Sequence, residues 1–213
     1  MWIAEIWRYP VKSMGGERLE SAELRADGIA GDRVVHVHDD RGRVLTSRTK
    51  SALLGLHATL GPRGEPLVDG RPWQDASVAA DVRRAAGETA VLERYEGVDR
   101  FDVLPLLVAT DGAIAAFAHD GRRLRPNLII GGVEGMAERE WEGRELRIGE
   151  VTIGVQDLRQ RCIMTTFDPD TQAQHVTVLH GINRRFAGKL ALNCRVLAPG
   201  TIRKGDDVNV STR

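Results

Sequence analysis

The sequence predicts a mostly β protein with a few short helices, an α+β fold built around β-barrels rather than a doubly wound sheet. Short β-branched and apolar segments recur along the whole chain, and turn residues such as those at 39–42 separate them. Only three stretches have helical spacing. A doubly wound sheet needs helices that alternate regularly with strands, and this chain has too few of them.

The first half of the chain is predicted to form strands followed by one helix. Aromatic and β-branched residues mark the first two strands, and the turn at 39–42 makes a hairpin with the third. The expected strands are Trp2 to Trp7, Arg33 to His38, Val44 to Thr46 and Leu54 to Leu60. Ala76 to Ala86 has helical spacing and stops at Gly87, which predicts a helix.

The second half adds two helices and the remaining strands. Asp111 to His119 is rich in alanine, with Thr110 or Asp111 placed to cap its first turn, and Val178 to Phe186 is the other helix. The expected strands are Leu128 to Gly131, Glu145 to Ile148, Val151 to Leu158, Leu190 to Leu197 and Asp207 to Val210. Gly97 and its charged neighbours interrupt the pattern, which predicts two domains at 1–96 and 97–213.

Composition excludes several classes of protein. The 213 residues hold 30 basic and 30 acidic side chains, so no net charge attracts nucleic acid or an anionic membrane. Any anion site must be local. No apolar run approaches the roughly 20 residues of a membrane span, and Glu5 stands where a signal peptide would be basic. We therefore expect a cytoplasmic protein with neither a nucleic-acid nor a membrane partner.

Two cysteines, Cys162 and Cys194, restrict the redox chemistry. An iron-sulfur cluster held only by cysteines needs four thiolates, so the chain cannot carry its own cluster of that kind. A disulfide between the two is possible in principle, but nothing marks the chain as secreted. We expect Cys194 to be a core residue of the strand from Leu190 to Leu197.

The segment around Cys162 is the most informative part of the sequence. The thiol stands between Arg161 and the hydroxyls of Thr165 and Thr166, and nearby cations favour the thiolate, the form that attacks or binds a metal. The alternative is a small buried hydrophobe. The following Asp-Pro-Asp-Thr at 168–171 is either a carboxylate pair for acid-base work or, as we prefer, a turn that aims Cys162.

His36 and His38 alternate on one strand, so both are expected on the same face. No third ligand with suitable spacing stands nearby, which argues against a metal site there. Lys12 is more suggestive, because the chain uses arginine 26 times and lysine only four times. Pro10 fixes the backbone before Lys12, and Ser13 supplies a hydroxyl for the same anion.

Five motifs, in order, resemble those of MOSC-domain proteins. They are Tyr-Pro-Val-Lys-Ser at 9–13, Gly-Asp-Arg at 31–33, Arg-Pro-Asn-Leu-Ile-Ile-Gly at 125–131, Arg161-Cys162 with the turn at 168–171, and Pro-Gly-Thr-Ile-Arg-Lys-Gly-Asp at 199–206. The set is similar to the branch that contains the mitochondrial amidoxime-reducing component and its bacterial relatives. The resemblance implies a MOSC-type β-barrel with an associated N-terminal β-rich domain.

The same resemblance implies a molybdenum cofactor and the residues that hold it. Cys162 would be the protein ligand to molybdenum and the catalytic residue, since a soft thiolate suits a metal already bound by dithiolene sulfurs. Arginine can bind the cofactor phosphate through two parallel hydrogen bonds. Asn127 would either position the pterin or only satisfy backbone groups. The implied cofactor-binding residues are Lys12, Ser13, Arg33, Thr110, Arg125, Asn127 and Arg161.

The resemblance further implies an oxidoreductase. It would reduce N-hydroxylated or other N-oxygenated small molecules of the amidoxime type, with electrons from an external donor protein, either ferredoxin-like or a haem or flavin reductase chain. Two other functions remain open. Cys162 could accept a persulfide and deliver sulfur, or the protein could carry molybdenum cofactor without catalysis.

Overall fold

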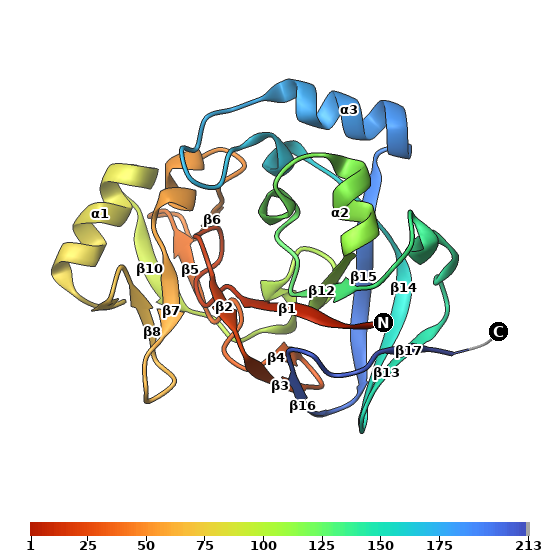
Figure 1. Cartoon of the computed structure of the whole chain (residues 1–213). Helices are drawn as coiled ribbons and strands as arrows, with labels where there is room; N and C mark the ends of the chain where they lie inside the picture. Colours follow the sequence, from red (N-terminus) through yellow and green to blue (C-terminus); the bar gives the residue numbers. More distant parts are fainter. Residues whose placement is uncertain (212–213) are drawn as a thin grey trace.

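The computed structural model describes residues 1–211, which form mainly β-strands as predicted (Figure 1). Its helices are α1 (Ala76–Ala86), α2 (Asp111–Phe117) and α3 (Val176–Phe186), with 3-10 helices at Ser51–Gly55, Val98–Arg100, Gly121–Leu124, Ala137–Glu140 and Ile163–Thr166. In the described residues no helix is long and apolar enough to cross a bilayer. The α+β class is therefore confirmed.

The largest sheet has eight strands in the order β17-β13-β14-β15-β11-β12-β1-β2. Only β11 and β12 run parallel; the other neighbours are antiparallel. The strands are β1 (Trp2–Arg8), β2 (Glu17–Leu19), β11 (Leu106–Thr110), β12 (Leu128–Gly131), β13 (Glu145–Ile148), β14 (Val151–Gln160), β15 (Lys189–Ala198) and β17 (Asn209–Val210).

This sheet curves until its two ends almost meet. An isolated bridge joins Trp2 to Asp207, and the Ile3 amide donates to the carbonyl of Asp206 at 2.9 Å. No continuous ladder joins β17 to β2 in residues 1–211, so the predicted barrel is a strongly curved sheet that is not closed.

Three smaller sheets complete the fold. Their orders are β10-β5-β6, β16-β3-β4 and β7-β8-β9. Their strands are β3 (Ser21–Arg25), β4 (Gly28–Ile29), β5 (Val35–His38), β6 (Val44–Leu45), β7 (Ala58–Leu60), β8 (Pro66–Val68), β9 (Arg71–Pro72), β10 (Val91–Arg94) and β16 (Gly200–Arg203). Figure 1 shows α1 beside β10 and β7 on one side of the molecule, and β14 and β15 on the other.

The two halves of the sequence share structural elements. β1 from the first half lies between β12 and β2 in the main sheet, and β16 near the C-terminus pairs with β3. The predicted division of the chain at residues 96 and 97 stays a prediction.

Separate apolar clusters lie under these elements. Cys194 is fully buried in the cluster of the main sheet, with Leu106, Leu128 and Leu192, which confirms its predicted core position. Burial raises the pKa of its thiol, so it stays neutral. A second cluster packs Val78 of α1 against the strands of the first half, and a third joins α2 to α3.

Some predicted boundaries were wrong. The expected strand from Leu54 to Leu60 is strand only at Ala58–Leu60, because consecutive Leu53 and Leu54 are both buried in a 3-10 helix instead of alternating. Helix α2 ends at Phe117, where Ala118 takes a left-handed conformation with φ 58°. Helix α3 begins at Val176, and the last strand is only Asn209–Val210.

A buried carboxyl group supports the start of α2. Thr110 caps this helix, as predicted, by accepting from the amide of Ala113 at 3.0 Å, and its hydroxyl donates to Glu138 at 3.2 Å. Glu138 is 0% exposed and its Oε1 has no partner among the described residues. Burial therefore raises the pKa of Glu138 above its ordinary value, which favours the protonated form in the folded protein.

Cys194→Ser is expected to lower the free energy of unfolding by about 1–3 kcal/mol, because it places a hydroxyl among apolar side chains. Urea denaturation of the reduced protein measures this. Cys162→Ser is the matched control, since Cys162 is outside the core and its substitution should cost much less. Equal losses in the two variants would contradict the assignment of Cys194 to the core.

Glu138→Gln should make stability less dependent on pH. A raised pKa means that the contribution of Glu138 is complete below its ordinary value of 4.5 and is lost as pH rises through the folded value. At pH 8 the variant should therefore melt about 2–4 °C above the wild type, a difference that corresponds to about 1 kcal/mol in the free energy of unfolding. At pH 4 its melting temperature should not exceed that of the wild type. Glu140→Gln, at an exposed position of the same 3-10 helix, should show no such divergence.

Candidate functional site

A cleft of about 760 Å³, measured out to open solvent, lies where segments from both halves of the chain meet. The predicted site residues in its wall are Lys12, Ser13, Arg33, Arg125, Asn127, Arg161 and Cys162. Residues 12–13 follow β1, Arg33 precedes β5, residues 125–127 precede β12, and residues 161–162 follow β14. The structure therefore brings together every predicted site residue except Thr110.

The wall of the cleft is strongly cationic. Besides Lys12, Arg33, Arg125 and Arg161 it contains Arg48 and Arg159, whereas Asp102 is its single carboxylate among residues 1–211. Asp32, just outside, pairs with Arg33. Two carboxylates thus face six cations, leaving an excess of four positive charges (6 − 2) in a chain without net charge. Such a cleft is suited to an anionic ligand.

Asp102 holds three of these cations together. Its carboxylate lies 3.2 Å from Lys12, 2.6 Å from Arg48 and 3.5 Å from Arg159. Burial acts to raise the pKa of Asp102, but Lys12 and Arg48 outweigh it and the pKa is lowered. Lys12 also donates to the carbonyl of Arg100 at 2.7 Å. Asp102 therefore stays ionised and fixes the positions of the three cations.

Arg33 and Arg125 lie around the ring of Tyr9. The Arg125 guanidinium lies 4.2 Å from the ring centroid and that of Arg33 5.1 Å, distances typical of cation-π contacts. Both arginines have a left-handed backbone with φ 55°, an uncommon conformation for these residues. Arg125 also donates to the carbonyl of Met14 at 2.8 Å. Burial raises the pKa of Tyr9 to about 12, so the ring is neutral between the two cations.

Arg161 has hydrogen-bonding capacity that the protein does not use. One nitrogen, Nη2, donates to the carbonyl of Leu124 at 2.8 Å, whereas Nε and Nη1 are buried without a partner among the described residues. Burial lowers the pKa of Arg161 to about 10, which still leaves it charged at neutral pH. Buried donors normally have acceptors, so Arg161 indicates a missing anionic or carbonyl partner.

Cys162 follows the long strand β14 as a free thiol that is partly exposed in the cleft. Register shifts against β15 mark β-bulges, which bend β14 ahead of this residue. The two hydroxyls that follow Cys162 in the sequence bind backbone carbonyl groups. Thr165 and Thr166 donate to the carbonyls of Cys162 and Ile163, at 2.9 and 2.7 Å.

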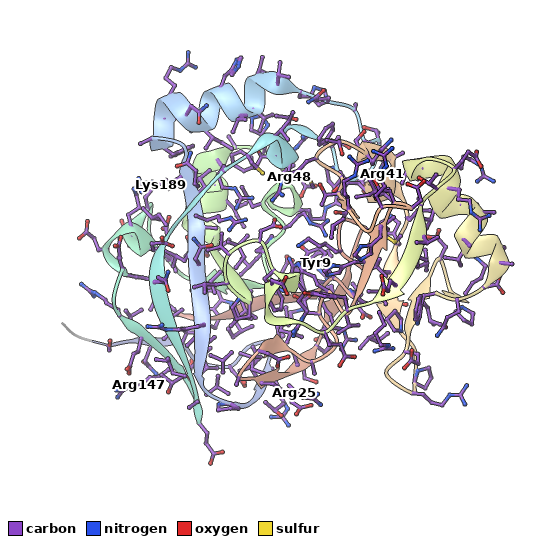
Figure 2. The ribbon with its side chains drawn as sticks, turned by 180° about the vertical axis from the view of Figure 1, so that it is seen from behind. Tyr9, Arg25, Arg41, Arg48, Arg147 and Lys189 are labelled. Carbon is purple, nitrogen blue, oxygen red and sulfur yellow. The ribbon has the colours of Figure 1, made fainter. Side chains whose placement is uncertain are left out.

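Arg48 lines the cleft together with Cys162. Burial acts to lower the pKa of Arg48, but the Asp102 carboxylate and the Cys162 sulfur raise it overall. Figure 2 shows the buried Tyr9 near the centre of the molecule, whereas Arg25 and Arg147 lie at its periphery. The Cys162 sulfur therefore has a cationic neighbour in the wall of the cleft.

The segment after Cys162 is a turn, as predicted. Asp168 Oδ1 accepts from the amides of Asp170 and Thr171 at 3.1 and 3.0 Å, and Oδ2 pairs with Arg123 at 2.8 Å. Asp170 pairs with Arg122. Both carboxylates are therefore occupied, and the alternative of a free pair for acid-base chemistry has no support in this arrangement.

Two predicted cofactor contacts fit less well. Thr110 is fully buried outside the cleft, and both roles of its hydroxyl are taken by Ala113 and Glu138. Its predicted cofactor contact has no support in this geometry. Asn127 lines the cleft, but its side chain accepts from Leu107 and donates to Asp32. That amide supports the backbone next to the site, which was one of the two roles considered for it.

His36 and His38 share one face, as predicted, with ring centroids 6.0 Å apart. Burial lowers the pKa of His36 to about 4. No group of three or more potential metal ligands of the His, Cys, Asp or Glu type occurs in residues 1–211, so the structure offers no metal centre built from these side chains alone.

Sequence reasoning missed Arg48 and Asp102 as members of the site. Each is a charged residue in an irregular segment, and Arg48 is one of 26 arginines. The only available signal was local: Arg100-Phe101-Asp102 places charges beside an aromatic just before the buried strand β11. Arg48 and Asp102 lie 54 positions apart in the sequence. The short spacings that mark helices, strands and motifs cannot identify a pair at that distance.

Comparison with known proteins agrees with this organisation. A model of the MOSC N-terminal beta barrel domain matches residues 1–110, and one of the MOSC domain matches residues 110–209. Human mitochondrial amidoxime-reducing component 1 is 24% identical, covering 97% of this chain and 82% of its own length. Mitochondrial amidoxime reducing component 2 of Macaca fascicularis is 25% identical, and the alignment covers 79% of this chain and 67% of that protein.

Among solved structures, the YuaD protein of Bacillus subtilis aligns over 99% of this chain and 98% of its own, with a TM-score of 0.53 and 13% identity. That likeness concerns the fold alone. The two family models together extend from residue 1 to residue 209 and meet at residue 110, at the end of β11. The chain therefore belongs to the MOSC-domain proteins that carry an N-terminal MOSC β-barrel domain.

Proposed function

We propose that the cleft binds molybdenum cofactor and that the protein reduces N-hydroxylated small molecules with electrons from an external donor protein. The observation that carries this proposal is the grouping of six cations around one free, partly exposed thiol. The relatives named amidoxime-reducing components support the reaction type.

The residues present fit the chemistry of this cofactor. Its phosphate needs cations and its pterin needs hydrogen-bond donors, and the cleft has an excess of positive charge. Arg161 contributes two buried donor atoms without protein acceptors. Cys162 contributes the soft ligand that such a metal prefers. When bound, the cofactor supplies a two-electron redox centre that can accept an oxygen atom.

The residues of the cleft would have different roles around that centre. Lys12, Arg33, Arg125 and Arg161 would hold the anionic part of the cofactor, while Ser13 and Asn127 complete the wall. Cys162 would ligate the metal, and Arg48 would place a positive charge beside its sulfur. Asp102 keeps Arg48 and Arg159 in position, so that mutual repulsion does not drive them into solvent.

Electrons must enter from outside the chain. Two cysteines cannot hold a Cys₄ iron-sulfur cluster, and one of them is buried in the core. The proposed donor is a ferredoxin-like protein or a haem or flavin reductase chain. In vitro, a reduced viologen dye can replace it.

Arg161→Ala and Lys12→Ala should each lower cofactor occupancy without unfolding the protein. Loss of a charge-assisted hydrogen bond costs about 1.5–3 kcal/mol, or roughly ten- to a hundredfold in affinity. Molybdenum per chain, measured after expression in a host that makes the cofactor, tests this together with the melting temperature. Arg147→Ala is the control, because that side chain is 64% exposed and outside the cleft. Full occupancy in both cleft variants would remove the proposed anion site.

Cys162→Ser should abolish amidoxime reduction with a reduced viologen and change the sulfur coordination seen by X-ray absorption at molybdenum, because a hydroxyl is a harder ligand than a thiolate. Cys194→Ser should keep both properties. Equal turnover in wild type and Cys162→Ser would refute the ligand assignment. Persulfide formation without molybdenum, lost only in Cys162→Ser, would identify a sulfur carrier, and bound cofactor without turnover would identify a non-catalytic cofactor carrier.

A further inference from the structure

A second cavity, of about 500 Å³ measured out to open solvent, adjoins the cationic cleft. Arg125 and Met164 belong to the walls of both, so the two spaces are neighbours separated by these side chains. Its wall is mainly apolar and aromatic, formed by Trp7, Tyr9, Leu54, Met164, Phe167 and Pro169. We call it the apolar cavity.

Two of the three arginines in the wall of the apolar cavity are paired with carboxylates. Arg122 pairs with Asp120 at 2.6 Å and with Asp170 at 2.7 Å. Arg123 pairs with Asp168 at 2.8 Å and donates to the carbonyl of Thr166 at 3.0 Å. The third, Arg125, also lines the cationic cleft, so among residues 1–211 the apolar cavity adds no unpaired arginine of its own for an anion. A neutral group that loses little by leaving water is the ligand that this wall favours.

Close packing around two glycines keeps the shape of this wall. A Cβ atom at Gly15 would lie 2.7 Å from His57 Nδ1, and one at Gly16 would lie 2.5 Å from the Tyr9 ring. The Gly15 amide donates to the carbonyl of Leu56 at 2.8 Å, and the Ala58 amide donates to that of Gly15 at 2.9 Å. The cavity wall is thus fixed by backbone hydrogen bonds before any ligand binds.

The position of the apolar cavity relates it to the reaction. Met164 stands two residues after Cys162 and lines both spaces. Its sulfur accepts a hydrogen bond from the hydroxyl of Ser47 at 3.3 Å, and Ser47 also lines the cationic cleft. A methionine side chain is flexible and adapts to the shape of an apolar neighbour. A molecule with a polar and an apolar end can therefore occupy both spaces at once.

We propose that the apolar cavity binds the neutral aromatic body of the substrate, while its N-hydroxylated end lies in the cationic cleft towards Cys162. The rings of Trp7, Tyr9 and Phe167 favour an aryl group over an alkyl chain, since aromatic pairs add attraction beyond the area they bury. This proposal rests on the proposed function and adds a substrate class to it: aryl rather than small alkyl amidoximes.

Binding can be tested apart from catalysis with N-phenyl-1-naphthylamine, a neutral fluorescent probe. His57→Trp places a large ring at an exposed position of the cavity wall and should weaken probe binding at least tenfold. His57→Ala, which removes the ring without filling the space, should stay within about threefold of the wild type. The control Val91→Trp, at a side chain 49% exposed and outside both cavities, should bind as the wild type does. Melting temperatures verify that all variants are folded.

Benzamidoxime should displace the probe and acetamidoxime should not. With a reduced viologen and cofactor-loaded protein, His57→Trp should raise the KM for benzamidoxime about tenfold and leave kcat/KM for acetamidoxime unchanged. Equal probe affinity in wild type and His57→Trp, or displacement by both amidoximes alike, would overturn the proposal. If neither amidoxime is reduced while benzamidoxime still displaces the probe, the apolar cavity stands as an aryl-binding site and only the proposed reaction fails.

Discussion

Repulsion among like charges is the constraint on which the rest of the site depends. Six cations in one cleft would separate and lower their mutual energy if nothing held them. Asp102 restrains three of them, Asp32 pairs with a fourth, and the neutral ring of Tyr9 lies against Arg33 and Arg125. The remaining excess of charge is what an anionic cofactor would neutralise, so binding and stability of the site are coupled.

The distribution of polarity also separates two kinds of recognition. In the cationic cleft, two donors of Arg161 lack acceptors among residues 1–211, whereas Arg122 and Arg123 of the apolar cavity are paired with carboxylates. Arg125 and Met164 stand at the border between the two. The cationic cleft is therefore suited to an anionic group, and the adjoining apolar cavity is suited to an apolar group.

Sequence alone predicted the class of fold and most of the elements, because strands, helices and turns are decided by local patterns such as Asp39 to Gly42. Local chemistry drew attention to Cys162 and Lys12, whereas Arg33 and Arg125, which lie in the same cleft, were predicted only through motifs shared with a family. Contacts between residues far apart in the sequence could not be predicted from local patterns. Arg48 contacts Asp102 by tertiary packing, and the hydroxyl of Thr110, expected at the cofactor, is buried against Glu138.

The meeting of Trp2 with Asp207 has a consequence for how the protein is made. β1 leaves the ribosome long before its neighbours at residues 205–208 are synthesised. The pairing of β3 with β16 is almost as distant in sequence. Such long-range contacts slow folding, and part of the β1 backbone stays unpaired until residues 205–208 have been synthesised. The nascent chain therefore depends on protection from aggregation throughout that interval.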